Sequence, residues 1–387
     1  MKDTLTAKFH NSIDAFDASE WNAMVDPDYP HLSHEFLTAA EHSQSVSNET
    51  GWQANHLGLY NEDKLVGAMP LYQKSHSWGE FVFDWSWADA YRRAGLEYYP
   101  KLISATPFTP ATAPKMLTTQ TDEAEAHQRA LLDAVLSFAR QHAFSSWHLQ
   151  FVATHERALC EANGLMLRED CQFHWHNRNY TDFDDFLSNF SSKKRKNVKR
   201  ERRRIKEAGI QHQIVAGDAI TDAQMADAWR LCSYTFMVRG HTPYLNLDFF
   251  NRLRTLRSES LALVLASDGE DTVAAAILLR GESTLFGRYW GSEAHHHSLH
   301  FETCYYQGIE YCIREGLQRF EPGTQGEHKV SRGFLPVATQ SAHWLAHPQF
   351  ASAIGDYLER EASGVERYKQ AIAARSPFKR NPEADAS

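Results

Sequence analysis

The sequence predicts an α/β protein with two domains, and three observations support this prediction. The chain has 387 residues, which is long for one hydrophobic core, so two domains of about 180–200 residues are expected. Hydrophobic residues make up 42% of the chain and charged residues 23%, as in globular proteins with buried cores. Helical and strand patterns alternate along the chain, and the same order of patterns occurs in both halves.

The first half combines short helices, strands and one long amphipathic helix. The turn signal Asn61-Glu62-Asp63 separates two apolar runs and indicates a strand pair. Four prolines between residues 100 and 114 exclude a regular helix there. The elements expected in this half are helices over 14–24 and 33–42, strands over 53–60, 65–73 and 79–87, a helix over 121–142, a strand over 146–152, a helix over 154–163 and a strand over 167–176.

The second half follows the same plan and begins with a strongly basic helix over about 192–208 that ends at Gly209. The other expected elements are helices over 223–237 and 247–257, a hairpin of strands 261–267 and 272–279, a strand over 284–291, a helix over 299–315, strands over 318–322 and 336–345, and a helix over 348–362. We therefore expect domains at 1–180 and 181–376, followed by a flexible polar tail over 377–387.

Composition excludes several classes of protein. No window of about 18 uninterrupted apolar residues is present, so no membrane-spanning helix is expected. The first ten residues lack the apolar region of a secretory signal. The five cysteines are an odd number without CxxC spacing, which is typical of reduced thiols in the cytoplasm. The sequence thus predicts a cytoplasmic protein.

Positive charge is concentrated in one segment, although the net charge of the chain is −9. Residues 193–206 include ten basic residues, and Glu201 is the single acidic residue among them. Such a segment indicates contact with a polyanion or a phosphate group. A tRNA acceptor stem, a nucleotide-linked cell-wall precursor and an anionic membrane surface all fit, and a solvated run of charges is the alternative.

The loop Glu327-His328-Lys329 is the main candidate for catalysis. It places an acid, a titratable imidazole and a cation together, and Gly323, Gly326 and Gly333 flank it. Transfer of an acyl group to an amine needs a stabilised oxyanion and a base for the proton of the amine. We expect Lys329 to bind the oxyanion or a carboxylate and Glu327 or His328 to be the base. The alternative is an exposed polar turn.

Further candidate residues lie on neighbouring elements. His300, as a substrate-binding residue, and Glu302, as a catalytic residue, are predicted in the first turn of the helix over 299–315. The alternative for Glu302 is that it only complements the helix dipole. Strand alternation places Arg288 and Trp290 on one face, where they would bind a phosphate or carboxylate or form a structural cation–π pair. The remaining predicted substrate-binding residues are Gln325, Arg332, Arg195 and Arg200, and the predicted cleft is lined by Trp85, Trp87, Arg288 and Trp290.

Three segments resemble the Fem-type aminoacyl transferases. The basic run from Ser191 to Gly209 is similar to the opening segment "RRNIRKA…G" of that family, and Gly287-Arg288-Tyr289-Trp290-Gly291 is similar to its "Y.G" strand. The segment from Glu327 to Phe334 resembles its "FK..FG" element, with Lys329 at the lysine position. The order of elements resembles the acetyltransferase (GNAT) topology. The resemblance implies an α/β fold of two tandem GNAT-like (acyl-CoA N-acyltransferase) domains, each a mixed, mostly antiparallel sheet flanked by helices.

More specific strings point to a narrower group. Three strings resemble the FemAB-like group described as peptidoglycan biosynthesis/recognition. They are residues 172–177 (QFHWHN), 299–302 (LHFE) with 304–307 (CYYQ), and 323–329 (GTQGEHK). The resemblance implies an N-acyltransferase that moves an acyl or aminoacyl group to an amine, with a cell-wall precursor as one acceptor. The donor would be acyl-CoA or aminoacyl-tRNA, tRNA or a phosphate would contact residues 193–206, and no metal is expected.

Two alternatives stay open at this point. One is a non-catalytic module that recognises peptidoglycan precursor or RNA. The other is a conventional acetyl-CoA-dependent N-acetyltransferase, although neither half contains the Q/R-x-x-G-x-G/A loop that binds the pyrophosphate of CoA. The sequence shows no nucleophile elbow, P-loop or dinucleotide fingerprint, which disfavours hydrolases, kinases and dehydrogenases. The run His295-His296-His297 is read as a polar loop rather than a metal site, because no carboxylate or cysteine cluster accompanies it.

Overall fold

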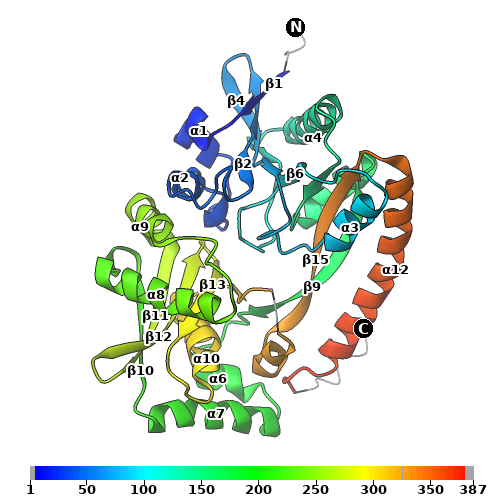
Figure 1. Ribbon diagram of the computed structural model, residues 1–387. Helices are drawn as coiled ribbons and strands as arrows, with labels where there is room; N and C mark the ends of the chain where they lie inside the picture. The colour runs from blue at the N-terminus through cyan, green and yellow to red at the C-terminus, as the bar shows by residue number, and fades with distance from the viewer. Residues whose placement is uncertain (1–4, 325, 380–387) are drawn as a thin grey trace. The chain divides into compact units, whose positions relative to one another are not determined.

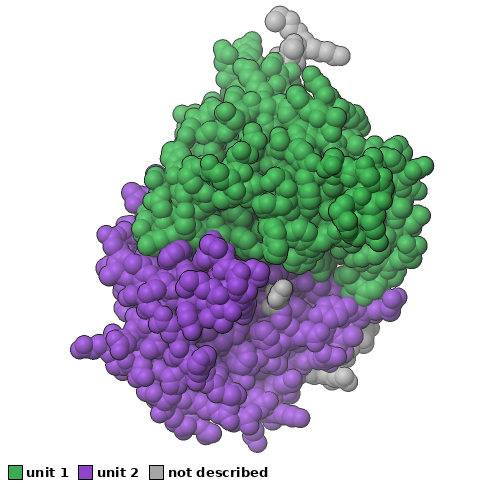
Figure 2. All heavy atoms as spheres, in the orientation of Figure 1, with its two compact units in different colours: residues 1–170, 244–252, 338–366 green, residues 171–243, 253–337, 367–387 purple. Residues whose placement is uncertain are grey.

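The computed structural model describes residues 5–324 and 326–379, which form two compact α/β units (Figures 1 and 2). Of the described residues, unit 1 comprises 5–170, 244–252 and 338–366, and unit 2 comprises 171–243, 253–324, 326–337 and 367–379. Strands β9 (Met166–His176) and β15 (Leu335–Leu345) each have residues in both units. The predicted limits of 1–180, 181–376 and 377–387 stay a prediction.

Unit 1 contains two groups of paired strands with helices around them. One sheet has the order β1-β3-β4-β7, and β2, β5, β6, β8 and β15 form a second row. The elements are β1 (Leu5–His10), η1 (Ile13–Ala15), α1 (Ala18–Asn22), η2 (Pro30–Leu32), α2 (His34–His42), β2 (Trp52–Ala54), β3 (His56–Asn61), β4 (Lys64–Met69), β5 (Tyr72–Lys74), α3 (Trp85–Arg93), β6 (Lys101–Ser104), β7 (Leu117–Thr118), α4 (Ala124–Gln141), β8 (Ser146–Leu149), η3 (Thr154–Glu156) and α5 (Arg157–Ala162).

The strand predicted over 79–87 is wrong. Trp85 begins helix α3 instead, and Trp87 and Tyr91 are buried on the inner face of that helix, four residues apart. Gly79 and Phe81 have φ values of 81° and 61°, in the left-handed region that ends regular strands. Trp85 is 39% exposed, so these two tryptophans do not share one strand face as the predicted cleft required.

The strand pair predicted over 53–60 and 65–73 is also divided. The first run breaks at Asn55 into β2 and β3, and the second breaks at Pro70 into β4 and β5. Because proline has no backbone N–H to donate to a ladder, Pro70 is a physical reason for the second break. The pieces then pair separately, β3 with β4 and β2 with β5.

Unit 2 is built on the row β10-β11-β12-β13-β14-β9, in which β13 and β14 are parallel and the other pairs are antiparallel. The predicted hairpin is confirmed as β11 and β12. The elements are α6 (Phe183–Ser188), α7 (Ser192–Glu207), β10 (Gln211–Ala216), η4 (Gly217–Ala219), α8 (Asp222–Val238), η5 (Ser258–Ser260), β11 (Leu261–Asp268), β12 (Asp271–Arg280), β13 (Thr284–Ser292), α10 (Leu299–Phe301), η6 (Glu302–Tyr306), α11 (Gln307–Glu315), β14 (Arg319–Glu321) and η7 (Glu327–Arg332). Helices α9 (Leu247–Leu256) and α12 (Pro348–Ala373) have residues in both units.

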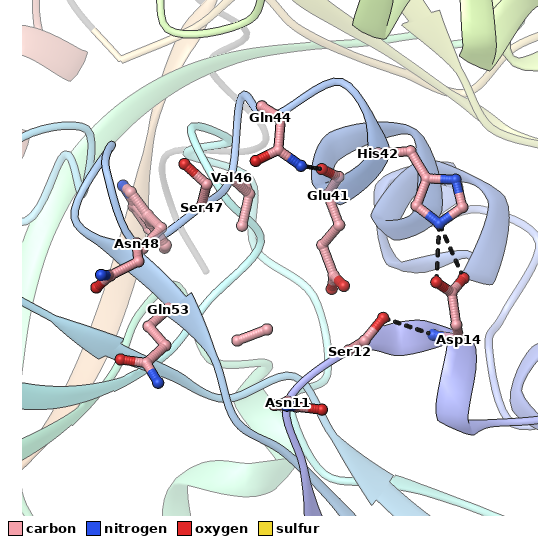
Figure 3. Close-up of a pocket in the computed structure, with 12 residues that line it drawn as sticks. Asn11, Ser12, Asp14, Glu41, His42, Gln44, Val46, Ser47, Asn48 and Gln53 are labelled. Atoms are coloured by element: carbon pink, nitrogen blue, oxygen red, sulfur yellow. Dashed lines mark hydrogen bonds and ion pairs between the residues drawn. The ribbon is translucent and has the colours of Figure 1, made fainter.

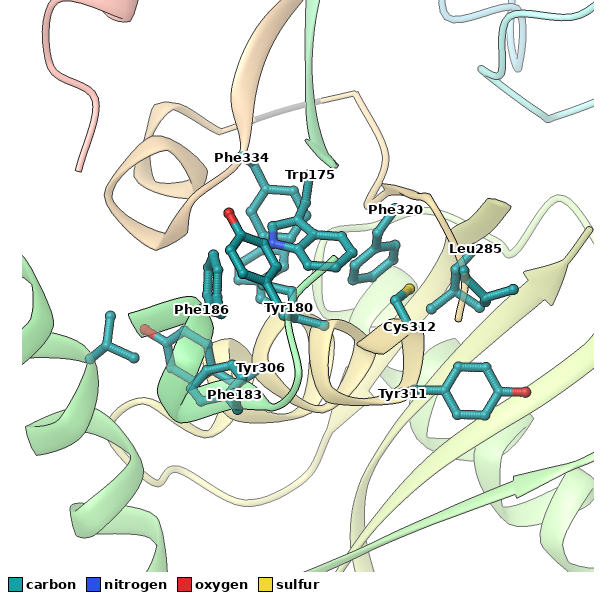
Figure 4. Close-up of a cluster of buried hydrophobic side chains, with 14 of the residues drawn as sticks. Trp175, Tyr180, Phe183, Phe186, Leu285, Tyr306, Tyr311, Cys312, Phe320 and Phe334 are labelled. Carbon is teal, nitrogen blue, oxygen red and sulfur yellow. The ribbon is translucent and has the colours of Figure 1, made fainter. Parts of the chain in front are cut away.

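An aromatic cluster forms the core of unit 2 (Figure 4). Trp175, Phe186 and Phe334 are fully or almost fully buried in it, and Phe320 of β14 packs edge-on against Phe334. Phe378, just inside the described C-terminal end, packs against Phe190 at a ring distance of 5.1 Å. This core fixes the segments that carry the candidate site.

The helix predicted over 299–315 is present, but it is not one regular α-helix. A π-helical turn, η6, separates α10 from α11, and the backbone N–H of Gln307 bonds back to the carbonyl of Glu302. The turn accommodates one extra residue, so Tyr305 and Tyr306 are both buried. Single π-turns inside α-helices occur frequently at functional sites.

None of the helices in the described residues combines the length and the apolar character that a bilayer-spanning helix requires.

Candidate active site

The site lies in unit 2, where strands β13 and β14 stop pairing. Their parallel ladder joins Thr284, Leu285 and Phe286 to residues 319–321 and ends there. A side chain at Gly287 would place its Cβ 3.1 Å from the Cα of Pro322, so glycine permits the close approach of the two segments. Beyond Gly287, β13 pairs only with β12 among the described strands. The second edge of β13 is therefore open from this point.

A bulge shifts the register of β13 at the same point. Tyr289 lies opposite Ile277 and Gly287 lies opposite Leu278, so Arg288 is an extra residue on β13. The bulge interrupts the simple alternation of β13, so the placement of Arg288 and Trp290 on one face stays a prediction. Arg288 is half-buried, and burial lowers the pKa of its guanidinium to about 10.

Lys329 is buried beside this strand end. It is 2% exposed, and its Nζ donates a 2.6 Å hydrogen bond to the carbonyl oxygen of Gly323. No carboxylate among the described residues lies within ion-pair distance of this ammonium. Burial lowers the pKa of Lys329 to about 7. A buried cation without a counter-ion is costly for the free protein and is available to an anion.

His328 lies next to Lys329 and is held by a tyrosine of the π-turn. Its Nε2 and the hydroxyl of Tyr305 share a hydrogen bond of 2.9 Å. Burial, together with the charges of Arg332 and Lys329, lowers the pKa of His328 below its ordinary value. The imidazole is therefore neutral at pH 7 and can accept a proton.

Aromatic rings extend this site toward β13. The ring of His300 lies 5.1 Å from that of Trp290 and 5.9 Å from that of His328, measured between centroids. Burial lowers the pKa of His300 to about 4, so it also is neutral at pH 7. The structure thus brings Trp290, His300, His328 and Lys329 together, as the sequence predicts for one site.

Arg332 anchors the loop that carries His328 and Lys329. Its guanidinium donates to the carbonyl of His328 at 2.7 Å and to Glu201 of helix α7 at 2.7 Å, and it lies 3.3 Å from the centre of the Phe301 ring. The hydroxyl of Tyr306 donates to the other oxygen of Glu201. Arg332 is 6% exposed, so the free protein uses it to connect the loop, helix α7 and the π-turn.

Glu302 is part of an ion-pair network centred on Arg202. Arg202 of α7 donates to Glu302 at 2.9 Å and to Glu310 at 2.8 Å, and Gln307 donates to Glu302 at 2.8 Å. The guanidinium also lies 4.4 Å from the centre of the Phe183 ring. This arrangement ties α7 to the helix that follows β13.

The structure does not bring every predicted residue to Lys329. Glu327 is exposed and pairs with Arg375 at 2.9 Å, on the solvent side of η7. Gln325 lies outside the described residues. Arg195 and Arg200 lie on α7, where they line a groove of about 500 Å³ together with Lys196, Asn197, Lys199 and Arg203.

Helix α7 has a buried side and a basic side. Val198 and Ile205 are its buried residues, while Arg202 faces inward to its two glutamates. A second hollow of about 490 Å³ lies along this helix and includes Lys199, Arg203 and Lys206. Most of the positive charge of α7 is therefore on the surface and available to an anionic partner.

Unit 1 has a polar cavity of about 470 Å³, lined in part by Asp14, Glu41 and His42 (Figure 3). Its charges are already paired. Glu41 accepts from His56 at 2.8 Å and from the backbone N–H of Ile13 at 3.0 Å. Asp14 accepts from His42 at 2.8 Å. Because these groups satisfy one another, the cavity is a weaker candidate than the site around Lys329.

Sequence reasoning missed three partners in the site. The aromatic pattern around Tyr305 is that of a core residue, and no local signal shows that its hydroxyl reaches His328. Glu201 is recognisable only as the single acid in the basic segment. The carbonyl of Gly323 has no sequence signature, because every residue carries a backbone acceptor.

Replacement of Gly326 by alanine is expected to lower turnover by at least about tenfold, because general-base catalysis depends on position. A Cβ at Gly326 would lie 2.3 Å from Cε1 of His328 and would displace the ring. Gly209→Ala is the control, since Gly209 also has a positive φ but no heavy atom within 4 Å of its Cβ position. The measurement is kcat of acyl transfer in folded protein. Wild-type turnover in Gly326→Ala would show that the position of His328 is unimportant.

Comparison with known families gives one match over nearly the whole chain. The FemAB-like family, described as peptidoglycan biosynthesis/recognition, matches residues 12–380. No curated protein matches the sequence at a significant level.

Several solved structures have a similar fold. FemX is 11% identical, with a TM-score of 0.53, and the match covers 88% of this chain and 98% of FemX. The C-terminal domain of a putative lysylphosphatidylglycerol synthetase from Agrobacterium fabrum is 11% identical, with a TM-score of 0.53 and coverage of 89% and 96%. L-PGS from Bacillus licheniformis is 10% identical, with a TM-score of 0.50 and coverage of 84% and 96%. At these identities the likeness concerns the fold, and the predicted class of two tandem GNAT-like units is confirmed.

Proposed function

The chain belongs to the FemAB-like family, and on this basis we propose that it transfers an aminoacyl group to an amine acceptor of the cell envelope. The observation that carries the proposal is the buried Lys329 ammonium beside the neutral imidazole of His328, at the open edge of β13. Location in the cytoplasm, where aminoacyl-tRNA and acyl-CoA are both present, is part of the proposal.

Lys329 stabilises the transition state. The amine of the acceptor attacks the carbonyl carbon of the donor ester or thioester, and the carbonyl oxygen becomes an oxyanion. The Lys329 ammonium, held by Gly323 and shielded from water, donates to that oxygen. Because negative charge beside Lys329 favours its protonated form, the pKa of about 7 rises as the oxyanion forms.

His328 accepts the proton that the amine loses. With a proton on Nε2 shared with the Tyr305 oxygen, Nδ1 is the acceptor. The imidazolium then returns the proton to the leaving oxygen or sulfur of the donor. Glu327 is the less suitable base, because it pairs with Arg375 at the surface.

The basic surface of α7 favours aminoacyl-tRNA as the donor. Its groove of about 500 Å³ is lined by Arg195, Lys196, Lys199, Arg200 and Arg203, a density of positive charge suited to several phosphates. CoA carries fewer phosphates, and the chain lacks the usual loop for its pyrophosphate. Acyl-CoA remains the second donor in the test.

Donor binding tests the function directly. We expect a pool of aminoacyl-tRNA to bind with an affinity that falls steeply with salt. Neutralising Arg195 and Arg200 together as Arg195→Gln/Arg200→Gln should lower the slope of log K against log salt by about 2. Transfer of the labelled amino acid to a nucleotide-linked peptidoglycan precursor is the activity readout.

The charge-matched control is Arg92→Gln/Arg93→Gln, two arginines at the end of α3 in unit 1. We expect this pair to leave the salt slope unchanged. Salt-insensitive binding of an acyl-CoA, with no binding of tRNA, would replace the proposed donor. Binding of precursor or RNA without any transfer would contradict the enzyme and favour a recognition module.

A further inference from the structure

Unit 1 contains a sheet whose two faces have opposite chemistry. On one face of β6 and β8, Leu102, Trp147 and Leu149 belong to an apolar core that packs under α4. On the other face, neighbouring strands carry Lys74, Lys101, His148 and His343 in a row. Each of these four side chains is at most 1% exposed. A row of ionisable groups therefore lies inside the unit.

Lys101 is fully satisfied by the segment that covers this face. Its Nζ donates to Ser77 Oγ and Glu80 Oε2, both at 2.8 Å, and to Asp84. Tyr98 donates to the same oxygen of Asp84 at 2.7 Å. Glu80 and Asp84 are each 2% exposed. Residues 75–84, which supply these partners, form no helix or strand.

Lys74 is far less well satisfied. It is fully buried, forms long hydrogen bonds to His76 Nδ1 at 3.4 Å and to the Trp78 carbonyl at 3.3 Å, and lies 4.1 Å from the centre of the Trp52 ring. No carboxylate among the described residues forms an ion pair with it. Burial lowers the pKa of Lys74 to about 7, although the charge of Glu80 opposes this.

Several polar atoms around this row have no partner among the described residues. They are Nε1 of Trp52, Oε1 of Glu80 and Oδ1 of Asp84, all buried. Buried donors and acceptors without partners are costly, and natural cores nearly always pair them with protein groups, ordered water or a bound ligand. Two donors, on Lys74 and Trp52, need an acceptor, while two carboxylate oxygens need a donor.

The charges of the lysines and carboxylates on this face indicate what kind of ligand could bind there. Two lysines and two carboxylates sum to zero when all are ionised, so a ligand of net charge would unbalance the interior. A ligand with both signs satisfies each group. We propose that this polar face of unit 1, termed the Lys74 face, binds a small zwitterion that carries a carboxylate and a protonated amine, as a free amino acid does. The carboxylate pairs with Lys74 and Trp52, and the amine pairs with Glu80 and Asp84.

Access is through the covering segment. Trp78 and Phe83 of this segment are 52% and 57% exposed, which is unusual for such large apolar side chains. A small cavity of about 40 Å³, lined in part by Val82, Phe83 and Ser341, adjoins it. Displacement of residues 75–84 would open Lys74 to solvent, because the carbonyl of Trp78 covers it.

The test measures binding to the full chain without any acyl donor. A panel of free amino acids is screened by ligand-observed NMR, and the best binder is compared by calorimetry with its matched amine and its matched carboxylic acid. We expect the zwitterion to bind at least tenfold more tightly than either half. Lys74→Met should lower affinity at least tenfold in protein whose thermal unfolding shows that it is folded. Lys64→Met, at an exposed lysine of β4, should leave the affinity unchanged.

Three outcomes would overturn the inference. They are no binding by any amino acid, equal binding by the carboxylic acid or the amine alone, and unchanged binding in folded Lys74→Met. Because no donor or turnover enters these measurements, failure here leaves the proposed transfer at Lys329 untouched. Conversely, loss of transfer in a Lys329 variant with intact amino-acid binding would separate the two sites.

Discussion

Replacement of Lys329 by methionine is expected to lower kcat by about 10²–10³-fold, the usual effect of removing one oxyanion donor. Methionine is nearly the same length, so the packing around Cys304 and Gly323 should persist. The variant should be at least as stable as the wild type, since a buried cation without a carboxylate partner is replaced by an apolar side chain. Single-turnover transfer and thermal unfolding measure the two effects.

The adjacent control is Glu327→Gln, whose side chain is exposed and paired with Arg375. We expect it to retain most of the turnover, and a loss as large as that of Lys329→Met would transfer the role of base to Glu327. Unchanged kcat in folded Lys329→Met would contradict the role given to the lysine.

Lys329→Met should also change how the stability of the protein depends on pH. The pKa of Lys329 is about 7 in the folded protein and near 10.5 in the unfolded chain. Between these values the unfolded chain binds more protons, so this group makes the wild type more stable as pH rises above 7. Urea unfolding between pH 6 and 8.5 gives the free energy of unfolding as a function of pH. We expect this free energy to rise more steeply with pH in the wild type than in Lys329→Met, by up to about 1.4 kcal/mol per pH unit. Lys74 contributes equally to both proteins and cancels.

Replacement of Arg202 by methionine is expected to destabilise the protein by about 3–5 kcal/mol, the cost of breaking a buried ion pair from one side. Glu302 is 4% exposed and would lose its cation, while Glu310 lies closer to solvent. The change would also detach α7 from the helix that follows β13. Urea unfolding measures the free energy.

Helix α7 supplies a matched control. Arg203→Met changes the same charge one residue away, but Arg203 is exposed and, within the described part of the chain, pairs only with Glu207 at 3.6 Å. We expect a change below about 0.5 kcal/mol. Adding Glu302→Gln to Arg202→Met should recover part of the lost stability, because it removes the unpaired charge. If Arg202→Met left the free energy of unfolding unchanged, the ion pairs of Arg202 would not stabilise the protein, which would contradict its structural role.

Hydrophobic periodicity correctly predicted the elements in which one face of apolar residues is buried. The helix over 121–142 appears as α4 (Ala124–Gln141), because Leu131, Val135 and their neighbours follow one helical face. The hairpin at Asp268-Gly269 appears as β11 and β12 for the same reason, since apolar runs flank a turn signal. Local patterns failed where aromatic residues fit both a strand and a helix. Trp85 and Trp87 alternate as in a strand, but they belong to the first turn of helix α3.

The sequence by itself determined the fold class, the basic helix and the loop that holds Lys329, because each is written in a run of adjacent residues. Only the tertiary structure decided what each charge does. It paired Arg202 with Glu302 and Arg332 with Glu201, turned Glu327 to solvent, and left Lys329 and Lys74 buried without a carboxylate partner among the described residues. The physical reason is that the pKa and availability of a charged group depend on burial and on partners tens or hundreds of residues away. Arg202 and Glu302 are 100 residues apart in sequence, and no local pattern links them.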